Sequence, residues 1–504
     1  MSLAASDLPD DVEALKAMLL SAREEISRKD QELAHRDLMI EKLQARLDKQ
    51  LRDRFGSSAE GIEQLQLMLE DLEITRSAET PLADVRPEPK DKPHRKPLPD
   101  HLPRRDQTLD PGEACNACGG RLKHVGEDIT EELEYVPGRF VVNRIIRPRM
   151  ACACCEAFQQ ASLPSRPIER GRPGPGLLAH VLVSKYADHL PLYRQSQIYA
   201  REGIDLQRST LADWMGKTTA LLTPLAEAIA IHVRAGDAIH ADDTPVDVLS
   251  PGRGKTVTGR LWTYVRDERP WGGATPPAAF YRFSMDRKGI HPAGHLTGYR
   301  GFVHADGYAG FGELFQAERI HEVACLAHVR RKSFDLAKDG RSTTAAEAVA
   351  RIAQLYAIED EARGEPTDRR AAIRQAKARP MFDDLGAWLR VQLQKLSAKS
   401  DLAKAIRYAL TRLPKLEVYL SNGRLEIDNN AAERSIRGLA IGRKNWLFAG
   451  SEGGGQTAAV AYTLIETAKL NAVDPQAWLA DVLGRIADHP ASKMDDLLPW
   501  KHAG

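Results

Sequence analysis

The chain has 504 residues, too many for one ordinary hydrophobic core, so we expect several domains. Its 71 Lys and Arg residues balance 70 Asp and Glu residues, and a formal net charge of +1 excludes an overall attraction to nucleic acid or to an anionic membrane. The sequence shows neither a secretory leader nor an apolar run near the roughly 18 residues that a membrane helix needs, so we expect a soluble, cytoplasmic protein.

A heptad pattern occupies the first predicted element, residues 1–54. Apolar residues recur seven positions apart along one seam, at Val12, Leu19, Ile26, Leu33, Ile40 and Leu47. A second apolar seam runs beside it and is interrupted by Lys29 and Arg36. This pattern favours a coiled coil through which copies of the chain associate. The alternative is a solvated amphipathic helix that packs on its own domain.

A linker is predicted for residues 55–110. It contains a short helix at residues 62–74 and a basic, proline-rich stretch at residues 86–105. Because proline disfavours regular structure, we expect that stretch to be extended.

Two cysteine pairs define the next predicted module, residues 111–166. Cys115 and Cys118 form the first pair, Cys152 and Cys155 the second, and the residues between the pairs resemble strands. Two pairs with C-x2-C spacing offer four thiolates to one tetrahedral zinc ion, which would stabilise the module without taking part in catalysis. Cys154 remains an alternative to either member of the second pair.

Helices are expected throughout residues 167–235. The stretch "YRQSQIYAREGIDLQRSTLADWM" has the layout of a helix-turn-helix, with Gly203 at the turn and Ser209 capping the second helix. In that arrangement Arg208, Ser209 and Thr210 face a DNA groove. An ordinary helical hairpin is the alternative.

Apolar residues then alternate with period two. We expect three consecutive strands, a helical spacer and two further strands, at residues 237–249, 259–267, 278–286, 301–311 and 321–329. This is the ribonuclease-H-like order of elements. We therefore predict an α+β multidomain chain whose ribonuclease-H-like α/β catalytic core is interrupted by a helical insertion. The core comprises residues 236–335 and 421–470, the insertion residues 336–420 and a helical tail residues 471–504.

Two aspartates lie where this topology brings strands together. Asp242 is in the middle of the first strand, and Asp306 is at the end of the fourth, 64 positions later. Aspartate is rare in strands and costly to bury unpaired, so both positions call for a cation or a hydrogen-bonding partner. A solvated aspartate is the alternative for either residue alone.

Several stretches resemble the large transposases of the insertion sequence 66 family: "HADDTPVDVL", "ADGYAGF", "CLAHVRRK" and "EIDNNAAERSIRGLAIGRKNWLFAGS". The paired cysteines, the N-terminal heptads, the linker "RKPLPDHLPRR" and the terminal "LLPW" are also similar, so the resemblance covers nearly the whole chain. It implies a DDE transposase with a triad at Asp242, Asp306 and Glu433. The family usually has glutamate where this chain has Asp243, which makes Asp243 a weaker rival.

Glu433 follows the polar residues Asp428, Asn429 and Asn430 at the start of a predicted helix. It could complete a capping box with Asn430 or serve as the third metal ligand. We expect the ligand role, with Asn430 or Asp428 capping the helix. Three carboxylates favour two Mg²⁺ or Mn²⁺ ions about 4 Å apart, which would activate the attacking oxygen and neutralise the leaving oxygen.

Basic residues flank the predicted triad and would contact DNA phosphates. They follow the fifth strand and Glu433: His328, Arg330, Arg331, Lys332, Arg434, Arg437, Arg443 and Lys444. Trp446 could stack on a base or join the core. A solvated basic face is the alternative for either cluster. The glycine-rich stretch from residue 450 is expected to be a loop, without the pattern of a nucleotide-binding site.

The leading prediction is a bacterial DNA transposase that binds the terminal inverted repeats of its element and target DNA. We expect a homodimer or a higher multimer that is associated with the nucleoid when bound to DNA. The resemblance also implies helper proteins of the same element. The alternatives are a ribonuclease-H-like nuclease without joining activity and an inactive DNA-binding regulator.

Overall fold

The computed structural model describes residues 98–136, 138–168, 171–250, 255–316, 319–338, 342–446, 449 and 451–502. All of them belong to one compact unit, which extends from Lys96 to Gly504. The predicted coiled coil at residues 1–54 and the short helix at residues 62–74 lie outside the described residues. In the described part of the chain, every helix is too short or too polar to cross a lipid bilayer.

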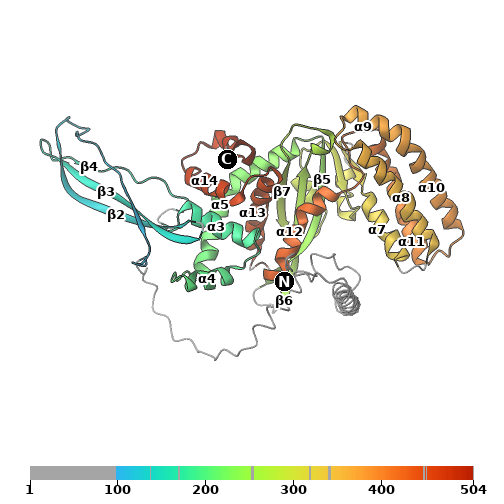
Figure 1. Cartoon of the computed structure of the whole chain (residues 1–504), viewed down its shortest axis with the longest axis horizontal. Coiled ribbons are helices and arrows are strands. Elements are labelled where there is room, and N and C mark those ends of the chain that lie inside the picture. Colours follow the sequence, from blue (N-terminus) through green and yellow to red (C-terminus); the bar gives the residue numbers. More distant parts are fainter. Residues whose placement is uncertain are drawn as a thin grey trace, which may run out of the picture. The chain divides into compact units, whose positions relative to one another are not determined.

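The first sheet carries the cysteine pairs at one end, before β2 (Leu122–Val136) and at the end of β3 (Arg139–Cys152). Its central strand, β3, pairs antiparallel with β2 and β4 (Phe158–Gln159), and parallel with β1 (Arg104–Thr108). The strands predicted between the cysteine pairs are therefore confirmed, and Figure 1 shows β2 and β3 as a long twisted ribbon.

The last part of the predicted linker, from Leu98 onward, is folded. Leu98 and Leu102 are buried, and the Arg104 guanidinium donates hydrogen bonds to the carbonyl oxygens of residues 98, 99, 100 and 102. The chain then enters β1 at Arg104. The expectation of an extended stretch through residue 105 is wrong here, because one arginine satisfies the carbonyls of the proline-containing loop and folds the loop around itself.

Three helices follow the first sheet: α3 (Pro175–Tyr186), α4 (Leu192–Arg201) and α5 (Arg208–Arg234). Gly203 lies in the predicted turn with φ of +80°. The predicted cap is wrong, since Gln207 occupies the N-cap position of α5 and Ser209 lies exposed in its first turn. The helix continues for 27 residues and contacts β7 and α13, so most of it belongs to the hydrophobic core.

The second sheet has five strands in the order β7-β6-β5-β8-β9. The first three strands are antiparallel, whereas β5, β8 and β9 are parallel to one another. The bounds are β5 Ala238–Ser250, β6 Lys255–Arg266, β7 Ala278–Ser284, β8 Gly301–Ala305 and β9 Ile320–Ala324, with the short helix α6 (Ile290–His295) before β8. The expected contact between the first and fourth strands, β5 and β8, is confirmed.

The last two strands are shorter than predicted. The chain leaves β8 at Asp306 and turns at Gly307, whose φ is +84°. After β9, Cys325 occupies the N-cap position of α7 (Leu326–Ala337). The expectation of strands through residues 311 and 329 is wrong, because apolar alternation continues past the turn and past the helix start.

Helix α13 (Glu452–Leu470) covers the β7 edge of the second sheet. The hydroxyl groups of Thr463 and Thr467 accept hydrogen bonds from backbone N–H groups of β7, which leaves this edge closed to further strands. The predicted glycine-rich loop is instead the first turn of α13, capped by Ser451. A Cβ atom on Gly455 would lie 2.6 Å from the Phe283 ring, so glycine permits the close packing of helix on strand.

The segment expected to be helical after β9 is helical. It comprises α7, α8 (Thr343–Ala362), α9 (Thr367–Ile373), a π-helical turn, α10 (Arg379–Gln394) and α11 (Asp401–Leu416), which share a hydrophobic core with β9 and lie together in Figure 1. Helix α12 (Asn430–Trp446) then packs on β5 and β6, and α14 (Pro475–Arg485) packs on α3. The domain boundaries predicted from the sequence stay predictions.

Candidate active site and cysteine cluster

Asp242 lies within β5, and Asp306 is the first residue after the parallel strand β8. The pairs Ala238–Phe302, Ile239–Val303 and His240–His304 join β5 to β8 with a constant offset of 64 positions. Asp242 lies two residues beyond His240 on β5, so its side chain shares a face of the sheet with that histidine. Asp306 directly follows the last residue of β8, and its negative charge acts on Asp242. The two carboxylates are therefore close in space.

The electrostatics of Asp242 reflect this crowding. Burial and the negative charge of Asp306 raise the pKa of Asp242 to about 8, and the charges of Asp243 and Glu433 act in the same direction. A hydrogen bond of 2.8 Å from the Asp243 N–H to Asp242 Oδ1 opposes the shift. A divalent cation would relieve this repulsion, and carboxylate oxygens are ligands that Mg²⁺ and Mn²⁺ prefer. The chemistry of these donors therefore suits such an ion. Among the described residues, however, Glu433 lies together with Cys325 and His328 within 4.8 Å, and not with the two aspartates.

A buried histidine pair lies beside the two aspartates. The rings of His240 and His304 stack with centroids 4.1 Å apart. The Nε2 atom of His304 accepts a hydrogen bond of 3.0 Å from the backbone N–H of Glu426, in the segment that leads to α12. Burial lowers the pKa of His240 to about 4 and that of His304 well below its ordinary value, so both rings are neutral at pH 7.

Sequence reasoning missed this histidine pair. The signal is the tripeptide His-Ala-Asp, which occurs at residues 240–242 and again at residues 304–306. In two parallel strands with matching register, the repeat places histidine opposite histidine, and an aspartate follows two residues later in each.

Asn429 connects the helix of Glu433 to β5. Its side chain is fully buried, donates to the Ala241 carbonyl oxygen at 2.9 Å and accepts from His240 Nδ1 at 3.1 Å. Its own carbonyl oxygen accepts the backbone N–H groups of residues 432 and 433, so Asn429 begins α12. Sequence reasoning treated Asn429 only as part of a polar cluster, because the burial of an asparagine cannot be read from its neighbours.

The sequence allows two roles for Glu433, helix capping and metal binding. At the start of α12, Asp428 takes the capping role. Asp428 Oδ1 accepts the backbone N–H of Asn430 at 3.0 Å, which confirms Asp428 as a capping residue. Glu433 lies in the first turn, and its Oε1 atom is 3.6 Å from His328 Nδ1 on α7. The carboxylate of Glu433 thus faces a side chain from another helix.

A tight turn fixes Asp306. The backbone N–H of Tyr308 donates to Asp306 Oδ1 at 2.8 Å, and the Tyr408 hydroxyl on α11 donates to the Asp306 carbonyl oxygen at 3.1 Å. Arg412, also on α11, packs so closely on Gly307 that any side chain at this position would overlap it. Helices predicted as an insertion therefore support the second aspartate directly.

Asp243, the weaker rival, has a different environment. Its side chain is 1% exposed and pairs with Arg260 at 3.2 Å and Arg287 at 2.7 Å. Since neighbouring residues of a strand point to opposite faces, Asp243 points away from Asp242 and Asp306. Two guanidinium groups already neutralise it, which argues against a metal-binding role.

The predicted DNA-contacting residues occupy three helices. His328, Arg330, Arg331 and Lys332 are on α7, and the last three are exposed; Arg208, Ser209 and Thr210 begin α5. On α12, Arg434 and Arg437 are exposed, whereas Arg443 is half-buried and donates to the Pro245 carbonyl oxygen. Lys444 and Trp446 are also on α12, but their side chains lie outside the described part. These DNA contacts stay predictions.

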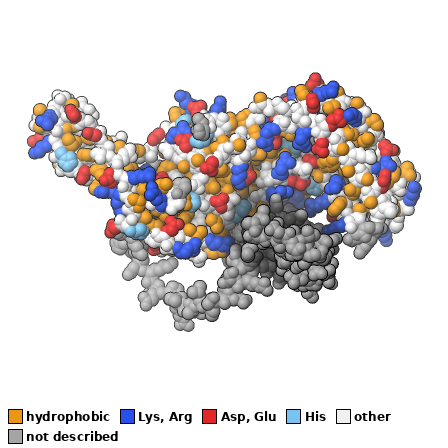
Figure 2. All heavy atoms as spheres, viewed as in Figure 1, with side chains coloured by type: hydrophobic (Ala, Val, Ile, Leu, Met, Phe, Trp, Pro, Cys, Tyr) orange, Lys and Arg blue, Asp and Glu red, His pale blue; other side chains and the backbone are white. Residues whose placement is uncertain are grey.

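The charge on the visible face is mixed. Figure 2 shows Lys and Arg side chains interspersed with Asp and Glu side chains. This agrees with the near-zero net charge and with the expectation that any attraction for DNA is local.

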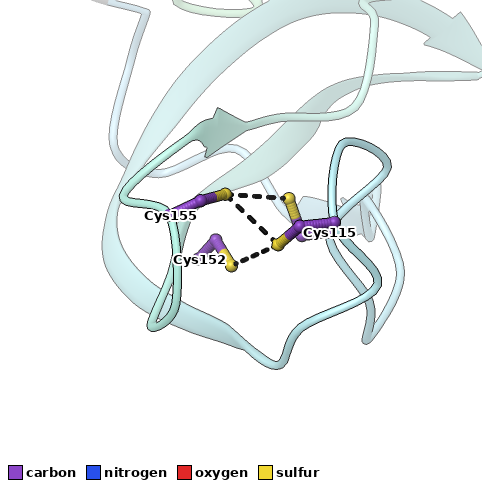
Figure 3. Close-up of side chains that lie close together, drawn as sticks. Cys115, Cys152 and Cys155 are labelled. Atoms are coloured by element: carbon purple, nitrogen blue, oxygen red, sulfur yellow. Dashed lines mark hydrogen bonds between the residues drawn. The ribbon is translucent and has the colours of Figure 1, made fainter.

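The four predicted zinc ligands form one cluster. Their sulfur atoms lie within 4.8 Å of one another, with Cys115–Cys155 at 3.6 Å, Cys118–Cys152 at 3.4 Å and Cys118–Cys155 at 3.3 Å (Figure 3). A tetrahedral ion with bonds of about 2.3 Å separates its ligands by about 3.8 Å. The cluster therefore fits a structural zinc ion after slight expansion.

Cys154 lies outside this cluster and is exposed. Its backbone N–H donates to Cys152 Sγ at 3.3 Å. The N–H groups of Cys155 and Cys154 lower the pKa of Cys152 to about 6, which favours the thiolate that a metal requires. The geometry thus selects Cys152 and Cys155, and gives Cys154 a supporting backbone role.

Comparison with known proteins defines the class of this protein. Sequence profiles described as "zinc-finger binding domain of transposase IS66", "Transposase C of IS166 homeodomain" and "IS66 C-terminal element" match residues 113–156, 42–106 and 463–500. The profile "Transposase IS66 family" matches residues 170–457, more than half of the chain. The protein is therefore a transposase, an enzyme that binds and cleaves DNA, with a zinc finger. It belongs to the IS66 family, as the resemblance implied.

Relatives of similar length occur in Sinorhizobium fredii. "Uncharacterized protein y4hP" is 43% identical over 490 residues, which cover 92% of this chain and 88% of the relative. "Uncharacterized protein y4qI" is 40% identical over 532 residues, which cover 99% of this chain and 98% of the relative. The similarity therefore extends over nearly the whole of both chains.

Proposed function

We propose that this transposase cleaves and joins DNA in a ribonuclease-H-like core through a DDE triad of Asp242, Asp306 and Glu433. The observation that carries the proposal is the parallel pairing of β5 with β8 together with the negative charge of Asp306, which acts on buried Asp242. The raised pKa of Asp242, caused by burial and by Asp306, supports a site that is complete only with a cation. The strand order agrees with the proposed core.

In this proposal, Asp242, Asp306 and Glu433 would hold two Mg²⁺ or Mn²⁺ ions. Bound there, the ions would activate the attacking oxygen and neutralise the leaving oxygen. Asp242 must lose its proton for this role, so metal binding releases a proton near neutral pH. Asn429 bonds α12 to β5, and Tyr408 and Arg412 bond to the Asp306 turn. These contacts support the proposal that the carboxylates would be positioned before DNA arrives.

The exposed cations of α7 and α12 would neutralise the phosphates that approach these carboxylates. Arg208, Ser209 and Thr210 would contact DNA at a second place, and a structural zinc ion would bind Cys115, Cys118, Cys152 and Cys155. The substrates would be the terminal inverted repeats of the element and a target DNA. Multimer formation through residues 1–54 and helper proteins of the same element belong to the same proposal.

The proposal is tested with DNA that carries the ends of the element and with Mg²⁺. Glu433→Gln keeps the size of the side chain and removes its charge, so we expect cleavage to fall by at least about 10³-fold. Glu452→Gln, an exposed glutamate in the first turn of α13, is the matched control and should cleave normally. Equal cleavage by Glu433→Gln and the unaltered protein would refute the triad.

A second substrate separates transposase from nuclease. A pre-cut end with a free 3′-hydroxyl group is incubated with target DNA, and joined product is measured. We expect joining by the unaltered protein and loss of joining in Glu433→Gln. Cleavage of intact ends without any joining would favour a nuclease of the same fold.

A further inference from the structure

Three potential metal ligands meet between α7 and α12. Cys325 occupies the N-cap position of α7, His328 lies one turn later, and Glu433 is in the first turn of α12. One ligand atom from each residue lies within 4.8 Å of the other two. The proposed chemistry uses Glu433 and places His328 near DNA, but it leaves Cys325 without a role.

The contact between His328 and Glu433 is too long for a hydrogen bond. The distance from Nδ1 to Oε1 is 3.6 Å, whereas an N–H···O bond is about 2.7–3.2 Å long. Among the described residues, His328 Nδ1 is a buried atom without a hydrogen-bond partner. Two ligands of one tetrahedral zinc ion, each at about 2.0–2.1 Å, lie about 3.4 Å apart. The spacing therefore suits an ion shared by both side chains.

Cys325 adds a sulfur atom at the same place. The residue is 3% exposed, and its Sγ atom accepts the backbone N–H of Asn429 at 3.2 Å. The backbone N–H groups of His328 and Asn429 both donate toward this sulfur atom. N–H donors and the start of a helix stabilise a thiolate once a cation is present.

A helix-capping role accounts for only part of this arrangement. It explains why Cys325 accepts backbone N–H groups at the start of α7. It does not explain why His328 Nδ1 is buried beside a carboxylate at the separation expected for two ligands.

We propose that Cys325, His328 and Glu433 form a second transition-metal site, separate from the four-cysteine cluster, that binds Zn²⁺. One thiolate, one imidazole and one carboxylate are a zinc donor set, and water would complete the tetrahedron. Binding breaks the S–H bond of Cys325 and forms an S–Zn bond, and the proton goes to solvent. Magnesium binds thiolate poorly, so this site and the carboxylate triad differ in the ion that they select.

If the proposed function holds, Glu433 belongs to both the zinc site and the magnesium site, so zinc would regulate cleavage. Zinc held by Cys325 and His328 would draw Glu433 away from the magnesium site. We therefore expect low concentrations of Zn²⁺ to inhibit magnesium-dependent cleavage, and excess Mg²⁺ to reverse the inhibition only partly.

The test counts metal ions in the full-length protein. Zinc is bound to saturation, weakly held ions are removed by dialysis, and zinc per chain is measured; Co²⁺ absorption then reports sulfur ligation. We expect two equivalents in the unaltered protein and one in Cys325→Ser and in His328→Gln. Cys154→Ser is the matched control and should retain two, since this exposed thiol lies outside both clusters.

His328→Gln keeps the test decisive if Cys325→Ser does not fold, because His328 is only half-buried. One equivalent in the unaltered protein, or two equivalents in both folded variants, would overturn the proposal. The cleavage rate of each variant with zinc is compared with its own rate without zinc. We expect inhibition of Cys325→Ser to need at least about 10-fold more zinc than inhibition of the unaltered protein. Two equivalents of zinc in a protein that never cleaves DNA would uphold this site and contradict the proposed function.

Discussion

Asp242 is buried and lies near another negative charge. In the absence of a cation, both features make its ionised carboxylate unfavourable in the folded protein. Its pKa of about 8 in the folded chain exceeds the unfolded value of 3.8. The neutral carboxyl group is thus the form that the fold favours. The stability associated with this form is fully present below about pH 4 and is lost as the pH rises toward 8.

Asp242→Asn should therefore stabilise the metal-free protein at high pH while abolishing activity. Asparagine stays neutral, so the fall in melting temperature between pH 5 and pH 8.5 should be smaller in the variant. We expect a higher melting temperature for the variant at pH 8.5. The gain per kcal/mol should be smaller than the value of about 2–4 °C for chains of 150–250 residues, because the entropy of unfolding grows with chain length. Thermal melts without divalent ions measure this, and parallel pH curves for the two proteins would contradict it.

Asn429→Ala tests the connection between α12 and β5. The substitution leaves the Ala241 carbonyl oxygen and the His240 ring without a buried partner, at a cost of about 1–3 kcal/mol for each group. We expect lower stability in urea and at least about tenfold slower cleavage. Asn430→Ala, which removes one bond to half-buried Asp428, is the control; a loss as large as that of Asn429→Ala would show that position 429 is not special.

At the residue scale, the sequence predicted those functional residues whose type is unusual for their position. Aspartate is conspicuous within a strand or directly after it, so Asp242 and Asp306 could be named before the fold was known. Asn429 resembles any polar residue of a turn, and its role depends on burial against β5. The predicted Ser209 cap failed for a related reason, since several polar residues near a helix start can cap it and only the backbone decides.

At the element scale, the pattern of strands and helices was predictable but several of their ends were not. Alternating apolar residues continue through Gly307 and through the start of α7, where backbone geometry ends the strands. The glycines at residues 453–455 suggested a loop, yet they form the first turn of α13. Glycine is needed at residue 455 because Phe283 leaves no room for a side chain there.

Substitution of these glycines separates packing from helix propensity. Gly455→Ala places a methyl group against the Phe283 ring and should cost about 1–3 kcal/mol through overpacking. Gly453→Ala meets its nearest neighbour at an ordinary distance of 3.7 Å and should be neutral or stabilise α13 by up to about 1 kcal/mol. Urea denaturation measures both, and equal effects would refute the close packing of α13 on β7.

At the scale of the whole molecule, a buried ionic network joins the helices after β9 to the segment that leads into α12. Arg374 pairs with Glu359 at 2.6 Å, and Arg370 pairs with Glu426 at 2.6 Å, in the segment before α12. The Glu426 backbone in turn donates to His304. The sequence could predict that these segments are helical but not that their charges meet in the core, because those residues are far apart along the chain.

Glu426→Gln tests this network. It removes the nearer carboxylate of Arg370, which is 1% exposed and keeps only Glu359 at 3.8 Å. Loss of one partner of a buried pair costs up to about 3–5 kcal/mol. Glu361→Gln breaks an exposed pair with Lys377 and should cost less than about 1 kcal/mol. Similar denaturation curves for the two variants would contradict a structural role for the network.

Iron-directed cleavage of the protein tests whether Asp242, Asp306 and Glu433 converge on one metal site. Fe²⁺ replaces Mg²⁺, and peroxide with ascorbate produces hydroxyl radicals that cut the nearby backbone; mass spectrometry locates the cuts. We predict cuts close to residues 242, 306 and 433 that compete with Mg²⁺ and disappear together in Asp242→Asn. Cuts that omit one of the three positions, or that persist in Asp242→Asn, would contradict the account.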